Sequence, residues 1–149
     1  MIHALTSENY KNITKVSILD AAAVFYPLKY VLQKRDIAFD EDLALIIYPM
    51  PEDIKYPASS KMTDAGVLRD YKIDISINNQ SPETEAQLER HINRPVIVVL
   101  HHNYGKIILG CNEMPLEYNY TDDNTTNPQS DNGFLVSCRG NAYFTKVSL

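Results

Sequence analysis

The sequence has few of the residues that crosslink a chain, bind metals or form phosphate loops. Its 149 residues include two cysteines, five glycines and no tryptophan. Cys111 and Cys138 are too few and too unpatterned for a disulfide framework or a metal site, so we expect two buried free thiols. The glycines occur singly, which argues against a glycine-rich phosphate loop. We therefore expect no metal and no cofactor.

Long apolar runs and an excess of positive charge are also lacking. No apolar stretch approaches the ~18 residues that span a bilayer, and Met1 to Asn12 lacks a basic region followed by a long apolar one. We therefore expect no membrane partner and synthesis in the cytoplasm. Lys and Arg number 14 against 19 Asp and Glu, a net charge of −5. That balance argues against direct binding of nucleic acid.

The remaining composition is that of a globular protein. Hydrophobic residues make up 44% and charged residues 22%, and the length suits a single domain over residues 1–149. Ten tyrosines stand against four phenylalanines. Tyrosine suits half-buried strand faces and wet contact surfaces, because its ring is apolar while its hydroxyl can stay solvated.

Most of the chain has the apolar patterns of strands. From Asp70 to Asn78, apolar and polar residues alternate, which predicts a strand with one buried and one wet face. Val96–Leu100 and Ile107–Leu109 are apolar runs on either side of a connection with Asn and Gly, which predicts a β-hairpin. Further strands are expected at 14–19, 28–32, 43–48, 116–120, 133–138 and 142–147, with Arg139-Gly140-Asn141 as the last turn.

One helix is expected, at about Pro82 to Ile92. Ser81 can cap it, Pro82 suits its first position, and two glutamates favour its positive end. Many strands and one helix predict a strand-rich α+β fold. We expect an antiparallel β-sandwich or a partly closed barrel with this helix against it.

No catalytic or metal-binding constellation stands out. His101 and His102 are adjacent on an expected strand and so point to opposite faces, which disfavours a shared metal. Asp122, Asp123, Asn124 and Asp131 are clustered oxygen ligands, but the loop lacks the glycine and glutamate of a calcium loop. No G-x-S-x-G elbow is present. We expect no enzyme; a small hydrolase with His101 as its base is the least favoured hypothesis.

A resemblance covers the stretch from His91 to Phe144. This stretch resembles small proteins that are encoded among the structural genes of phages and prophages. The segments that carry the resemblance are Val96–Leu100, Asn103–Lys106, Ile107–Gly110, Met114–Tyr118 and Asn132–Ser137.

The resemblance implies a virion subunit of the tail or neck, which assembles into rings or tubes. Such a subunit would be a homo-oligomer that contacts other virion proteins and passes from the host cytoplasm into the virion. It needs no active site, but it needs sheet edges and loops that pair with neighbours. The loops at 48–60 and 121–132 are the expected contacts, through Tyr48, Tyr56, Asp122, Asp123, Asn124 and Asp131.

The alternative is a monomeric module that binds carbohydrate or peptide. Tyr118 and Tyr120 lie two residues apart in the expected strand Leu116–Tyr120 and therefore share a face. Aromatic rings on one face could form such a contact surface. A half-buried strand face explains the same pattern.

Overall fold

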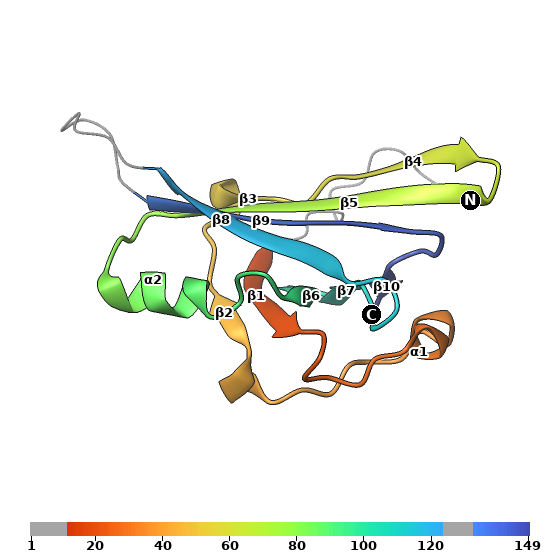
Figure 1. The fold of residues 1–149 in the computed structure, drawn as a ribbon, viewed down its shortest axis with the longest axis horizontal. Coiled ribbons are helices and arrows are strands. Elements are labelled where there is room, and N and C mark those ends of the chain that lie inside the picture. Colours follow the sequence, from red (N-terminus) through yellow and green to blue (C-terminus); the bar gives the residue numbers. More distant parts are fainter. Residues whose placement is uncertain (1–11, 124–132) are drawn as a thin grey trace.

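The computed structural model of the protein describes residues 12–123 and 133–149 (Figure 1). Within these residues, ten strands form one antiparallel sheet that does not close on itself, which confirms the strand-rich α+β fold. The strands are β1 (Ile13–Asp20), β2 (Leu45–Ile47), β3 (Ile54–Lys55), β4 (Ala58–Thr63), β5 (Gly66–Ile77), β6 (Pro95–His102), β7 (Gly105–Leu109), β8 (Leu116–Asp123), β9 (Gly133–Ala142) and β10 (Val147–Ser148).

The same part of the chain has two α-helices, α1 (Leu28–Leu32) and α2 (Pro82–Glu89), and two 3₁₀ turns, η1 (Glu41–Leu43) and η2 (Pro51–Asp53). Neither helix is long and apolar enough to cross a membrane.

The sheet bends into two halves that face each other. One half has the order β2-β1-β6-β7-β10, and the other places β8, β9 and β5 side by side, with β3 and β4 both along β5. The halves join where Pro95 and Val96 of β6 pair with Glu117 and Leu116 of β8. In Figure 1, β5, β8 and β9 form a layer above β1, β6 and β7. The expected two-sheet sandwich or barrel is therefore one open, bent sheet.

Apolar side chains fill both faces of the β1-β6-β7 half. Val96–Leu100 of β6 are all 0% exposed. The even-numbered residues of this run lie in a core between the two halves of the sheet, and the odd-numbered ones lie in a second core under Tyr26, Val31 and Ile37. Because both faces are covered, β6 is a continuous apolar run. Burial of each such side chain stabilises the fold by about 1.5–3 kcal/mol.

Helix α2 begins at the expected residue and ends early. The Ser81 hydroxyl accepts a hydrogen bond from the Thr84 backbone N–H at 3.2 Å, and Pro82 occupies the first turn, as predicted. Leu88 is the buried residue of the helix, at 1% exposure. The α-helix ends at Glu89, before the expected end at Ile92, and continues as a turn.

Three expected elements are wrong. The strand expected at 142–147 is absent: β9 ends at Ala142, residues 143–146 lie outside strands, and β10 begins at Val147. Residues 28–32 form helix α1 instead of a strand; Pro27 stands at its N-cap, and Val31 is its buried residue. Strand β9 continues through Arg139-Gly140-Asn141, where we expected a turn. The reason is packing: a Cβ atom on Gly140 would run into the Leu116 side chain, so glycine here permits close contact with β8.

Candidate interaction surfaces

Residues Ala58–Arg69, here called the arm, are a two-stranded extension of the sheet. Strand β4 pairs with β5 from Ala58 opposite Tyr71 to Thr63 opposite Gly66, and Figure 1 shows the pair extending past the body. Every β4 side chain except Thr63 is exposed, and Met62 is 79% exposed. Within the described residues β4 pairs only with β5, so one edge of it is open to another strand.

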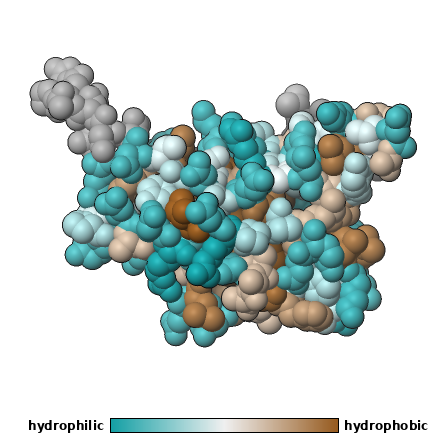
Figure 2. Space-filling view, in the orientation of Figure 1, coloured by the Kyte–Doolittle hydropathy of each residue, from teal (hydrophilic) through white to brown (hydrophobic). Residues whose placement is uncertain are grey.

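A second open strand is β2, which pairs only with β1 in the part of the chain that the structure describes. Its neighbours in sequence expose large apolar side chains: Leu43 is 56% exposed, Tyr48 74% and Met50 59%. Most of the face in Figure 2 is hydrophilic, and separate apolar areas interrupt it, one of them at the lower left. An open strand with apolar flanks is a natural site for pairing with another chain.

The segment around β2, residues 40–53, is strongly acidic. It contains five carboxylates and no lysine or arginine: Asp40, Glu41, Asp42, Glu52 and Asp53. Lys15 of β1 pairs with Glu41 at 2.6 Å and lowers the pKa of that carboxyl. We call this segment, with its open strand and exposed apolar side chains, the β2 edge.

A polar groove of about 470 Å³ lies on the outer face of β5, β9 and β8. Lys72, Arg139 and Glu117 stand opposite one another across the three strands, and Asp74, Ser137 and Asn119 form the next row. Lys72 lies 3.4 Å from Asp74, which also accepts a hydrogen bond from the Ser137 hydroxyl at 2.9 Å. The groove therefore presents mixed charges and amides to solvent.

The face of the alternative hypothesis, Tyr118 and Tyr120, is buried at Tyr118 and half-buried at Tyr120. Tyr118 is 6% exposed, and its hydroxyl donates to the Leu88 carbonyl of α2 at 2.9 Å. Burial raises the pKa of Tyr118. Tyr120 packs edge-on against Phe134, and its hydroxyl donates to the Glu89 carboxylate, which raises the pKa of Tyr120 to about 12. The two tyrosines share a face, as predicted, but that face holds α2 on the sheet.

The expected contact residues lie on separate elements. Tyr48 is exposed at the β2 edge, whereas Tyr56 is half-buried against the main core. Asp122 is exposed near the end of β8, and Asp123 pairs with Gly133 of β9. The other two residues of the prediction, Asn124 and Asp131, lie outside the described residues.

The arm itself was missed by sequence reasoning, which treated 48–60 as one irregular loop. The available signal was Asp64-Ala65-Gly66, a turn whose glycine has a φ of +125°, between a short polar run and the alternating residues of β5.

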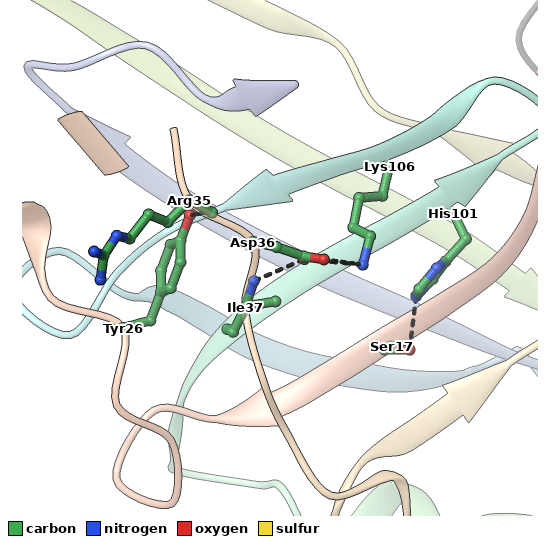
Figure 3. A network of polar contacts seen from close by, with 7 residues as sticks. All are labelled: Ser17, Tyr26, Arg35, Asp36, Ile37, His101 and Lys106. Carbon is green, nitrogen blue, oxygen red and sulfur yellow. Dashed lines mark hydrogen bonds and ion pairs between the residues drawn. The ribbon is translucent and has the colours of Figure 1, made fainter. Parts of the chain in front are cut away.

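Figure 3 shows a cluster of polar contacts beside the second core. It joins side chains of β1, β6 and β7 and the segment 33–37. Ser17 Oγ and His101 Nε2 are 3.3 Å apart and share a hydrogen bond. Burial and then the nearby Lys15 and Lys106 lower the pKa of His101. Ser17 is 0% exposed, so its hydroxyl is closed to a substrate carbonyl. The pair therefore has a serine–histidine contact without the accessible nucleophile that acyl transfer requires.

The rest of this cluster fastens residues 33–37 to the sheet. Lys106 Nζ contacts both Asp36 carboxylate oxygens at 2.9 and 3.0 Å, and the Tyr26 hydroxyl donates to the Arg35 carbonyl at 2.7 Å (Figure 3). Partial burial acts to raise the pKa of Asp36, but hydrogen bonds from Lys106 and the Ile37 N–H outweigh it and lower that pKa. Burial raises the pKa of Tyr26 to about 12. These contacts hold residues 33–37 against the sheet and Tyr26, a structural role.

The remaining candidate ligands are dispersed. The side chain of His102 accepts a hydrogen bond from the Tyr104 N–H at 3.1 Å, away from the Ser17 contact of His101. Across residues 12–123 and 133–149, no group of three His, Cys, Asp or Glu side chains is arranged to hold a metal ion. Cys111 and Cys138 are free and buried, as predicted, and burial raises the pKa of both thiols, to about 12 for Cys138.

The chain matches no protein-family model, no curated protein and no solved structure. Among the surfaces of the described residues, the arm and the β2 edge each have a strand that is paired along one edge and open along the other.

Proposed function

We propose that the protein is a structural subunit of a phage-like particle, in the tail or neck, and that it acts by self-assembly. The observation that carries this proposal is the arm. Strand β4 exposes nearly all of its side chains and contributes none to either core. An isolated two-stranded hairpin is only marginally stable in water, so the arm should gain stability when a partner covers it.

Two further features support the proposal. The β2 edge combines an open strand with three exposed apolar side chains, which a neighbouring chain could cover. The resemblance of His91 to Phe144 to phage structural proteins covers β6 to β9, which include the β6–β8 pair that joins the two halves of the sheet. An assembling subunit uses such a sheet as a scaffold and its edges as contacts.

The test is the absolute mass of the purified protein by light scattering coupled to size exclusion, over a wide concentration range. Self-assembly predicts a mass that grows with concentration, and rings or tubes in negative-stain images of the leading fraction. A strict monomer at every concentration would overturn the proposal.

A carbohydrate- or peptide-binding module is the second candidate, and the outer groove favours it. Its place would be the row of Lys72, Arg139 and Glu117, because Tyr118 is buried. If the protein is monomeric, titration with oligosaccharides and with extended peptides tests this function. Arg139→Ala should weaken any binding, whereas Lys29→Ala, an exposed change on α1, should leave it unchanged.

A further inference from the structure

The two open strands lie at separate edges of the sheet. Strand β4 lies along β5 in one half, and β2 lies along β1 in the other. Figure 1 shows the arm at the upper right and β2 at the lower left, on opposite sides of the molecule. A contact between the two edges therefore joins different copies of the chain.

The charges at the two edges are opposite. Residues 40–53 carry five carboxylates and no basic residue, and Lys15 pairs with one of them. Residues 54–63, which include β3 and β4, carry Lys55 and Lys61 and no carboxylate. Both lysines are exposed. Opposite charges across a strand pair stabilise it, and like charges destabilise it.

The same charges oppose pairing of β2 with its own copy. Antiparallel self-pairing would bring Asp40–Asp42 of one copy toward Glu52 and Asp53 of the other, and every charge in that contact would be negative. Pairing of β4 with its own copy would bring lysines together and leave the exposed Tyr48 and Met50 uncovered. The other edge strands in the described chain, β3 and β10, have only two residues each.

We propose that the arm of one copy adds strand β4 to the β2 edge of the next copy. With β4 parallel to β2, Met62 then meets Tyr48 and Met50, Lys61 lies toward Glu52 and Asp53, and Lys55 lies toward Asp40–Asp42. A contact between two different surfaces is heterologous, so it repeats from copy to copy and closes into a ring or continues as a filament. This inference rests on the proposed function and names the partner surface for it.

Crosslinking tests the pairing directly. Met62→Cys and Tyr48→Cys variants are purified separately, mixed, and treated with a short bis-maleimide, which tolerates a small error in register. We expect a crosslinked dimer in the mixture and in neither variant alone. A chain that carries both changes should give a ladder of crosslinked oligomers. The native thiols are buried, and the wild-type protein checks that they stay unreactive.

The matched control is Leu32→Cys mixed with Met62→Cys. Leu32 is 69% exposed on α1, away from the β2 edge, so this mixture should give no dimer. A dimer from Tyr48→Cys alone would indicate β2 self-pairing, and one from Met62→Cys alone would indicate arm self-pairing; either result overturns the inference. Assembly without any crosslink in the Met62–Tyr48 mixture overturns it while the proposed function stands. A monomer at all concentrations overturns both.

Charge reversal gives an independent readout. Lys61→Glu should raise the concentration for half-assembly by about 2–5-fold, because an exposed ion pair contributes modestly. Glu52→Lys in the same chain should recover part of that loss, since the reversed pair attracts again and Glu52 lies on the Tyr48 side of β2. Lys29→Glu on α1 is the matched control and should leave the concentration for half-assembly unchanged. An equal effect of Lys29→Glu and Lys61→Glu would show that only net charge matters, and would overturn the inference.

Discussion

At the scale of single residues, Tyr118 connects helix α2 to the sheet. Its ring is buried in the main core, and its hydroxyl donates to the Leu88 carbonyl at the C-terminal end of the helix. His91 lies edge-on to the same ring, with ring centroids 6.0 Å apart. One side chain therefore fixes both the position of α2 and the turn that follows it.

Tyr118→Phe should lower the free energy of unfolding by about 1 kcal/mol, because it removes a buried hydrogen bond and leaves the Leu88 carbonyl with only the His91 N–H, at 3.4 Å. Urea denaturation followed by circular dichroism measures the change. The matched control is Tyr143→Phe, at a side chain that is 48% exposed, which should stay within about 0.5 kcal/mol of wild type. Equal effects from the two variants would contradict a structural role for the Tyr118 hydroxyl.

The tyrosines also show how far residue spacing can predict a surface. The period of two correctly places Tyr118 and Tyr120 on one face of β8. Which face meets solvent depends on α2, which lies about thirty residues earlier in the chain and packs over them. Local sequence contains no information on that packing, so the exposed tyrosine face could not be distinguished from a buried one.

At the scale of elements, the strands with a clean pattern were predicted and the irregular ones were not. The alternation in β5 and the apolar runs of β6 and β7 predict those strands, because burial imposes the pattern directly. Strand β9 was split wrongly at Gly140, because a glycine needed for packing against Leu116 looks like a turn residue. Helix α1 was missed because five residues are too few to show a helical period.

The arm provides a prediction about stability. Ser60 stands directly opposite Arg69, so residues 61–68 can be replaced by Asn-Gly, a two-residue hairpin turn. Because the deleted β4 side chains are largely exposed, we expect the free energy of unfolding to stay within about 1 kcal/mol of wild type.

The same trimmed protein should lose self-assembly, which light scattering measures on a sample whose fold circular dichroism has verified. Replacement of residues 61–68 by eight residues of glycine and serine keeps the chain length and should also abolish assembly. A folded, trimmed protein that still assembles would remove the arm from the contact.

At the scale of the whole molecule, the excess negative charge is concentrated in one segment. The net charge of −5 equals the number of carboxylates in residues 40–53, while the adjoining residues 54–63 are basic. Composition alone predicts only weak interaction with nucleic acid. The fold adds that the acidic and basic segments belong to two separate sheet edges, which sequence order could not indicate because they are neighbours in the chain.

This separation predicts that salt weakens assembly. The Debye length falls from about 10 Å at 0.1 M to about 3 Å at 1 M ionic strength, so sodium chloride should screen the attraction between the β2 edge and the arm. The concentration for half-assembly should therefore rise with salt in the wild-type protein. In the Lys61→Gln variant, the concentration for half-assembly should be higher than in wild type at low salt. It should also rise less with added salt, because one attractive charge is missing. Assembly that strengthens steadily with sodium chloride would mean that burial of Met62 and Tyr48 dominates the contact and that the charges do not select the partner edge.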